Sequence, residues 1–278
     1  MTTTIVGGRL RMISALAAVA VLGSCAMMEE PIADEEVAEL VGSSVSGSTN
    51  GELAVLGSIS ESDVVTPSVS DPRSRSVSVE QTVTRAAGDL VLNLEVTFYN
   101  GGFAAADEVS SSAEADRFSV EGSVTGSGER TRYDTSIDST IDWQIVDSDG
   151  VLFDGQGTYT INGSSTQQSS VEFTSFNANR ARTFEGDLSR TWSDVQAAIT
   201  TENDVATADP IGGTISVSGS YTRSGSGTFR SASGSWNGEA TVDFDSDGTA
   251  TVTVDGQRSY EVDLADGTTV EVEVQSGN

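Results

Sequence analysis

The chain has 278 residues, of which 42 are acidic and 14 basic, and its formal net charge at pH 7 is −28. It contains no histidine, and every basic residue in the sequence is an arginine. Without histidine or lysine there can be no Ser-His or Cys-His relay, no imidazole metal site, no Schiff base and no lysine-containing phosphate loop. So acidic a chain also repels phosphates, and we expect no nucleic-acid partner.

Two interpretations account for the excess of acid. The first is adaptation to high salt, because molar salt screens self-repulsion over about 3 Å and acidic side chains keep the surface hydrated. The second is cation binding. The acids are spread along the whole chain and lysine is absent, so the sequence favours salt adaptation, the halophilic interpretation.

The amino-terminal segment has the organisation of an export signal. Arg9 and Arg11 give a positive start, an apolar run extends from Met12 to Leu22, and small residues lead to the only cysteine, Cys25. A run of about 11 residues is too short to span a bilayer, which needs about 20. With a single cysteine the chain can form no internal disulfide and no thiolate metal site.

Leu22-Gly23-Ser24-Cys25 resembles the lipobox of bacterial lipoproteins. The resemblance implies that residues 1–24 are a signal peptide cut before Cys25, and that the Cys25 thiol and the new amino terminus carry lipid, palmitate included. Two or more acyl chains anchor a protein stably. The partner it implies is therefore a membrane of the bacterial cell envelope. Ala26 after the cysteine favours the outer membrane.

Residues 25–75 have the composition of a tether. Acidic residues dominate up to Glu39, and a Ser/Gly-rich stretch with Pro67 and Pro72 follows. Such a segment buries little apolar surface, so we expect a mostly extended, disordered spacer. Residues 35–41 could add one helical turn and residues 52–59 a weak strand.

From about residue 76 to the end at 278 the pattern is that of half-buried strands. Apolar and polar residues alternate with period two over 89–99 and 141–145, and again through the last third of the chain. Asp-Gly pairs at 247–248, 255–256 and 266–267 separate the last strands and suit tight hairpins. The sequence therefore predicts a mainly β domain, namely an antiparallel sandwich, an open barrel or a broad curved sheet.

Helical patterns are few. Trp192, Val195 and Ile199 share one face of a possible short helix, and residues 104–115 have helical composition. We expect a long loop over 194–210, so the β domain could divide into two subdomains near 190–211. Trp143 and Trp236 lie among apolar residues and, with Trp192, are expected in the core.

One acidic motif has the spacing of a metal site. Asp243, Asp245 and Asp247, followed by Gly248, match the opening of an EF-hand calcium loop. Val254 stands where the bidentate glutamate would close the loop, and no helices flank it. The alternative, which we favour, is that these carboxylates lie on the solvent face of a strand and in its hairpin turn. Otherwise no cofactor is expected.

Arginines recur at two-residue spacing. Arg130 with Arg132, and Arg180 with Arg182, would share strand faces. They could grip an anionic glycan through bidentate hydrogen bonds, or neutralise Asp and Glu on neighbouring strands, which is the commoner role. The sequence identifies neither a protein nor a glycan partner.

Three hypotheses for function remain. The leading one is a non-catalytic envelope lipoprotein that presents an acidic β domain for structural or binding roles. The closing strands over 248–264 resemble those of uncharacterised β-rich envelope lipoproteins, a resemblance that implies no activity. The second is a carrier or sensor of a small apolar or lipidic ligand, which requires a cavity lined by Phe, Leu and Val. The third is a carboxylate-dependent glycan hydrolase, which requires a cleft with two carboxylates roughly 5–9.5 Å apart.

Overall fold

The computed structural model describes residues 31–46, 51–61, 76–85, 88–109, 112–129, 133–148, 152, 157–174, 180–202, 205–227, 233–265 and 268–272. The signal peptide, the lipobox residues Leu22, Gly23 and Ser24, and Cys25 lie outside the described residues.

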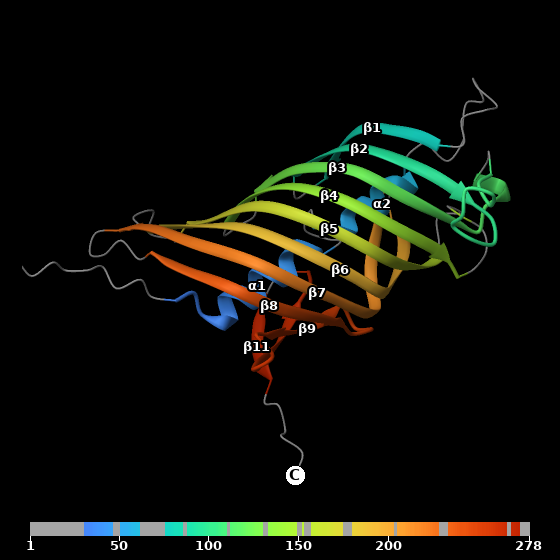
Figure 1. Cartoon of the computed structure of the whole chain (residues 1–278). Coiled ribbons are helices and arrows are strands. Elements are labelled where there is room, and N and C mark those ends of the chain that lie inside the picture. Colours follow the sequence, from blue (N-terminus) through green and yellow to red (C-terminus); the bar gives the residue numbers. More distant parts are fainter. Residues whose placement is uncertain are drawn as a thin grey trace, which may run out of the picture.

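The domain is one antiparallel sheet of eleven strands in which each strand pairs with its neighbours in sequence (Figure 1). Strands β1 and β11 form its two edges, and the sheet does not close on itself. The strands are β1 (Ser76–Arg85), β2 (Gly88–Tyr99), β3 (Arg117–Glu129), β4 (Tyr133–Asp147), β5 (Gly157–Thr174), β6 (Arg180–Glu202), β7 (Val205–Gly227), β8 (Gly234–Phe244), β9 (Thr249–Val254), β10 (Arg258–Asp263) and β11 (Thr269–Val272). The mainly β expectation is confirmed, and among its three architectures the structure is the broad curved sheet.

Alternation of side chains explains why these residues form strands with one buried face. In β2 the apolar side chains of residues 90, 92, 94, 96 and 98 are all buried, whereas the intervening side chains are exposed or half-buried. The same alternation holds in β8 and β9. Tight turns follow at Gly248 and Gly256, which have the positive φ values of 87° and 64° that glycine tolerates. The sequence pattern therefore fixes which face turns inward.

Strands β6 and β7 correct the expectation of a helix and a loop over 192–210. Both are 23-residue strands, and they pair from Arg180 with Gly227 to Glu202 with Val205. A bulge interrupts the register between Ser193 and Gln196. Residues 190–202 and 205–211, in the region where a division into subdomains is expected, therefore lie within hydrogen-bonded strands of the one sheet.

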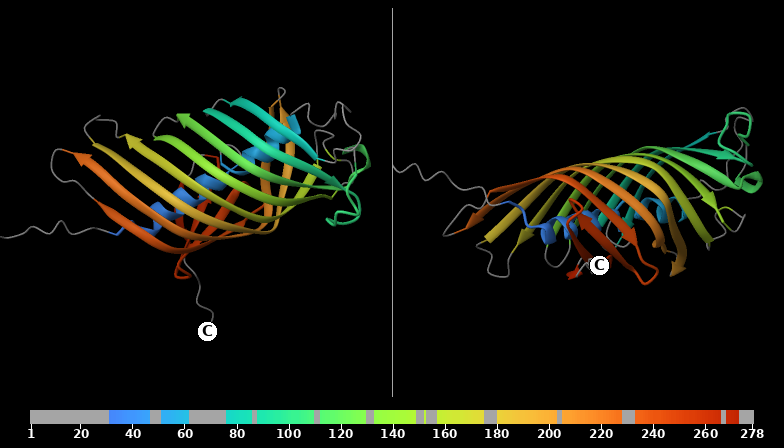
Figure 2. Two further views of the ribbon diagram at one scale, coloured as in Figure 1. Left: turned by 45° about the horizontal axis from the view of Figure 1, so that its top comes forward. Right: turned by 60° about the horizontal axis from the view of Figure 1, so that its bottom comes forward.

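Two helices occupy the concave face of the sheet, α1 (Asp34–Val45) and α2 (Leu53–Glu61) (Figures 1 and 2). The helical turn expected over 35–41 is confirmed as part of α1, whereas the extended tether expected over the rest of these residues and the weak strand over 52–59 are corrected. In α1 the side chains of Val37, Leu40, Val41 and Val45 are all buried, at the three- and four-residue spacing of an apolar stripe. At its start Glu36 accepts a hydrogen bond from Ala33 N at 3.3 Å.

The core lies between these helices and the inner face of the sheet. Buried apolar side chains from both helices and from strands β1 to β10 form one continuous cluster. Trp143, Trp192 and Trp236 belong to it, as expected, and the rings of Trp143 and Trp192 lie 4.9 Å apart between centroids. Residues 104–109 and 112–115 form a loop with one short 3-10 turn, η2 (Ser112–Glu114), in place of a helix.

Candidate functional site: the helix–sheet interface and the outer face

Arginines of the sheet bind the amino-terminal helical segment, which comprises residues 31–46 and 51–61. Arg182 Nη1 and Arg223 Nη1 both bind the Glu36 carboxylate, at 3.0 and 2.9 Å. Arg258 Nε lies 3.8 Å from Asp34 Oδ2, also on α1. Among arginines whose side chains the structure describes, these three and Arg190 face the helices. Arg117, by contrast, pairs with its neighbour Asp116.

The most deeply buried of these contacts joins β6 to the residue that precedes α2. Arg190 Nη1 donates to Glu52 Oε1 at 2.8 Å, and the two side chains are 0% and 1% exposed. Arg190 Nη2 also donates to Ser44 Oγ and to Gln167 Oε1, both at 2.7 Å. The guanidinium therefore ties both helices to strands β5 and β6.

The second oxygen of Glu52 binds β5. Ser165 Oγ donates to Glu52 Oε2 at 2.7 Å and in turn accepts the indole N–H of Trp192 at 3.1 Å. Burial raises the pKa of the Glu52 carboxyl, and the positive charge of Arg190 opposes that rise. The hydrogen bonds from Ser165 to Glu52 and from Arg190 to Ser44 and Gln167 offset part of the cost of burying this charged pair.

This buried network holds the helices against strands β5 and β6 and is not placed to act on a substrate. Its carboxylate and guanidinium are inaccessible to solvent, so no substrate can touch them in this conformation. Within the described residues, Gln167 Nε2 and Arg190 Nε have no acceptor, which adds a desolvation cost to the network. We therefore name Glu52, Arg190, Ser165, Gln167 and Ser44 the buried latch.

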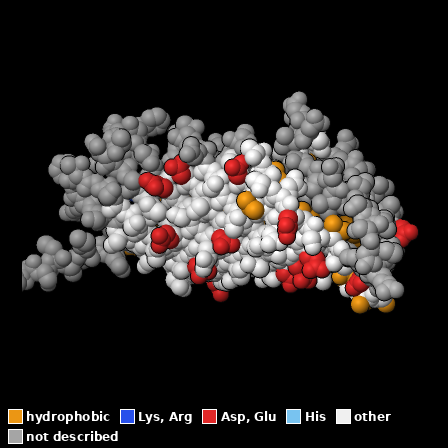
Figure 3. Space-filling model, turned by 90° about the horizontal axis from the view of Figure 1, so that it is seen from above, with side chains coloured by type: hydrophobic (Ala, Val, Ile, Leu, Met, Phe, Trp, Pro, Cys, Tyr) orange, Lys and Arg blue, Asp and Glu red, His pale blue; other side chains and the backbone are white. Residues whose placement is uncertain are grey.

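The outer, convex face of the sheet is exposed to solvent (Figure 3). Figure 3 shows mostly uncharged side chains on this face, with Asp and Glu scattered among them. Its exposed acids, one or more on most strands, are Glu80, Asp89, Glu95, Glu121, Asp134, Asp138, Asp142, Glu172, Glu185, Asp187, Asp209, Glu239, Asp243 and Glu261. Because the described arginines of the inner face pair with the helices, charge is segregated between the two faces.

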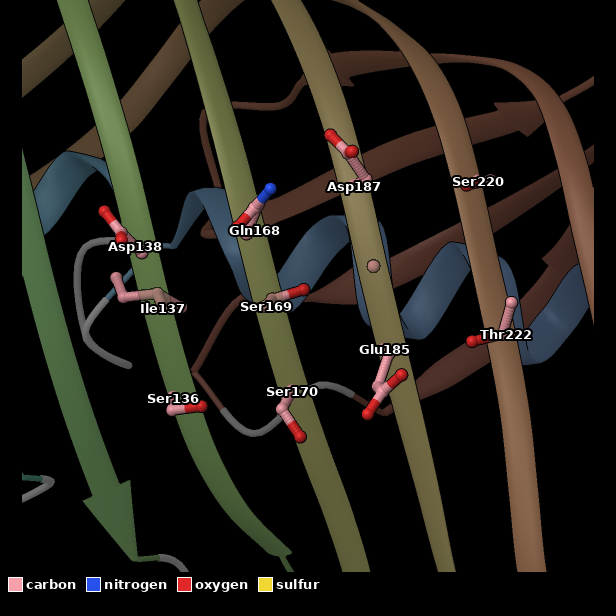
Figure 4. A pocket seen from close by; sticks show the side chains of 11 residues that line it. Ser136, Ile137, Asp138, Gln168, Ser169, Ser170, Glu185, Asp187, Ser220 and Thr222 are labelled. Atoms are coloured by element: carbon pink, nitrogen blue, oxygen red, sulfur yellow. The ribbon is translucent and has the colours of Figure 1, made fainter.

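A shallow hollow of about 590 Å³, lined mostly by polar residues, lies on this outer face, across β4 to β7 (Figure 4). The carboxylates of Asp138, Glu185 and Asp187 line it together with the Gln168 amide and serine and threonine hydroxyls. Gly186, which also lines it, is packed against the Tyr221 ring of the inner face, since a Cβ there would lie 2.4 Å from Tyr221 Cε1. The carboxylates of the hollow can accept hydrogen bonds from a cationic or hydroxyl-rich ligand, and its hydroxyl and amide groups can also donate hydrogen bonds to ligand hydroxyls.

The three candidate calcium ligands lie at the end of β8 and in the following turn. Asp243 Oδ1 accepts a 2.7 Å hydrogen bond from Thr214, and Asp247 Oδ1 accepts the backbone N–H and hydroxyl of Thr249 at 3.2 and 2.7 Å. The hydrogen bonds from Thr249 lower the pKa of Asp247. Across the described ranges no group of three or more His, Cys, Asp or Glu side chains is placed to hold a metal ion. Calcium binding stays a prediction.

The arginine pairs are described only in part. Arg130 and Arg132 lie outside the described residues, as does the side chain of Arg180. Arg182 lies at an inner-face position of β6 and binds Glu36. At this residue the structure favours neutralisation of an acid, although the acid belongs to a helix rather than to a neighbouring strand.

Sequence reasoning missed the buried latch. One signal was present, because Arg190 lies between Leu188 and Trp192 at an inward position of an alternating strand, where a charge is unusual. Its partner Glu52 is 138 residues away in the chain, so the pattern alone gave no means of pairing them.

Comparison of the chain with protein-family models, curated proteins and solved structures finds no match in any of the three. Within the described ranges, neither helix combines the length and apolar character needed to cross a bilayer.

Proposed function

We propose that this protein is a non-catalytic lipoprotein of the bacterial cell envelope that presents an acidic β sheet to binding partners. The observation that carries the proposal is that the chain's own helices cover the inner face of the sheet. The outer face, with its acids and hydroxyls, is then the broad surface available to partners. The lipobox resemblance at Cys25 supports the anchor and the envelope location, with the outer membrane favoured by Ala26.

The anchor is tested by expressing the full chain in a bacterial host and measuring the mass of the amino-terminal peptide. We expect acyl groups on Cys25 and recovery of the protein with the membrane fraction. Cys25→Ser is the matched control and should be released from membranes. An unmodified Cys25 thiol, or wild-type protein recovered in the cytosol, would contradict the proposal.

The carrier hypothesis required an apolar-lined cavity. In the described part of the chain the apolar side chains of the inner face are packed against α1 and α2, and the hollow on the outer face is lined by Asp, Glu, Gln, Ser and Thr rather than by Phe, Leu and Val. These observations favour the presenting role. Titration of the purified domain with a fluorescent fatty acid tests the choice, because saturable micromolar binding would support a carrier.

The hydrolase hypothesis has one observation in its favour. Glu185 and Asp187 lie two residues apart on β6 and both line the outer hollow, a separation of about 7 Å along a strand. A general acid, however, is normally kept protonated by burial, and both carboxylates are exposed. Release of reducing ends from envelope glycans by the wild type, and loss of that release in Glu185→Gln, would support hydrolysis over presentation.

A further inference from the structure

The amino-terminal chain is fixed to one particular end of the sheet. Ile32 N donates to the backbone oxygen of Ser235, the second residue of β8, at 3.4 Å. A few residues later Glu36 binds Arg182, near the start of β6, and Arg223, near the end of β7. We call this the entry end: the end of β5 and β7 and the start of β6 and β8. Figures 1 and 2 show α1 beginning there and running inward.

Little chain remains between this end and the cysteine. Ile32 is the seventh residue after Cys25, and seven steps of 3.3–3.6 Å reach at most about 25 Å. The tether that the composition of residues 25–75 indicates, about 50 residues as a flexible coil, would have an average span of about 40 Å and a far longer maximum. The helices therefore replace a loose spacer with a short connection.

Because the sheet is much longer than this connection can reach, the connection limits where the lipid can lie. Strand β6 has 23 residues, which at 3.3 Å per residue give about 75 Å along the strand. A lipid on Cys25 can thus lie near the entry end but not near the opposite end, where β6 turns into β7. The outer face is also unsuited to lie on a membrane, because its exposed acids repel anionic headgroups.

We propose that the protein stands on a lipid surface with its entry end toward the bilayer and its acidic outer face directed sideways into water. The inference rests on the proposed lipid at Cys25 and adds to it the part of the fold that meets the membrane. The opposite end of the sheet, beyond the β6–β7 turn, is then the part presented farthest from the bilayer.

Fluorescence transfer to the membrane tests this orientation. Cys25 is the only cysteine and its thiol is occupied by lipid in the anchored protein, so one introduced cysteine gives a unique site for a donor dye. Ser224→Cys and Ser216→Cys form a matched pair, because both are exposed serines on the outer face of β7. Gln144→Cys labels β4 toward the opposite end.

The lipidated variants are placed in phosphatidylcholine vesicles containing phosphatidylglycerol and a headgroup-labelled acceptor lipid. We expect transfer to fall in the order 224, 216, 144. The value at 224 should be about three-fold that at 216, because eight residues of strand separate them by roughly 27 Å. Inserting a ten-residue Gly/Ser segment after Glu30 should lower transfer at 224.

The outcomes separate the two proposals. Protein that does not float with the vesicles overturns the lipid anchor, and with it this inference. Protein that floats but gives equal transfer at all three positions, or the reverse order, overturns the orientation and leaves the anchor standing.

Discussion

Single residues decide whether the helical segment stays on the sheet. The Glu52 carboxylate and the Arg190 guanidinium are both removed from water, and each provides the charge that makes burial of the other tolerable. Removing one charge leaves the other without a counter-charge, whereas removing both relieves the desolvation cost. The latch is therefore sensitive to single substitutions and comparatively tolerant of a paired one.

We predict that Glu52→Gln lowers the free energy of unfolding by about 3–5 kcal/mol, because it keeps the shape of the side chain but leaves Arg190 uncompensated. Urea unfolding followed by tryptophan fluorescence measures the change. Asp34→Asn is the control, since Asp34 faces the exposed Arg258 at 3.8 Å and should have no measurable effect.

The double variant Glu52→Leu/Arg190→Met should be more stable than Glu52→Gln alone, because no buried charge remains. Unfolding of the wild type, Glu52→Leu, Arg190→Met and the double variant under one set of conditions measures this coupling. Additive losses, with the double variant less stable than either single one, would show that the two side chains do not act as a pair.

A second residue-scale prediction concerns acid. Asp116 accepts hydrogen bonds from Arg117 Nε and Nη2 and from Gly101 N, and the bonds from Arg117 hold its pKa at about 2, below the ordinary 3.8. Because the folded state binds the proton less readily than the unfolded one, this contribution is complete above pH 3.8 and is lost as the pH falls toward 2.

Asp116→Asn should therefore lower stability at neutral pH and flatten the decline between those two values. Urea midpoints across an acid pH series give the comparison. Asp142→Asn, which removes one exposed charge from the outer face of β4, is the control for net charge. The same acid slope in wild type and Asp116→Asn would count against the assignment. The effect should be modest, since the Asp116 side chain is 37% exposed.

At the scale of elements, the close packing of α1 on β10 depends on a glycine. A Cβ added at Gly42 would lie 2.7 Å from Val262 Cγ1 and 3.3 Å from Val262 Cβ, and valine has little rotamer freedom with which to move away. In an isolated helix the same change from glycine to alanine would be stabilising by about 1 kcal/mol. Packing and helix propensity thus oppose each other at one residue.

We expect packing to dominate, so that Gly42→Ala lowers the free energy of unfolding by about 1–2 kcal/mol. Val262→Ala should make room for the added methyl group. In that background the Gly42→Ala change should become neutral or stabilising, as measured by thermal unfolding of the four proteins of the cycle. A stabilising effect of Gly42→Ala in the wild type would show that α1 does not approach β10 so closely.

At the scale of the whole molecule, charge and salt are linked. The whole chain carries a net charge of −28, and the exposed acidic side chains of the outer face repel one another. The range of this repulsion shrinks from about 10 Å at 0.1 M salt to about 3 Å at 1 M. We predict that the melting temperature rises steeply with NaCl over this interval. A flat response would remove the halophilic interpretation.

How much was predictable differs from element to element. The alternation in β2 placed Leu90 and Phe98 on the buried face correctly, because a period of two depends only on neighbouring residues. In β6 the bulge after Ser193 adds a residue, so the inward positions become 192, 195, 197 and 199. Positions 192, 195 and 199 are three and four residues apart, which is the spacing of one face of a helix. For this reason the sequence pattern indicates a helix where the structure has a strand.

The amino acid sequence by itself determined the class of fold and the orientation of most strand faces, since both follow from local periodicity and turn residues. Only the tertiary structure decided that residues 34–45 and 53–61 are helices. Such short segments become stable by burying an apolar stripe against a surface, and that surface belongs to strands far along the chain. For the same reason only the folded molecule could bring Glu52 to Arg190.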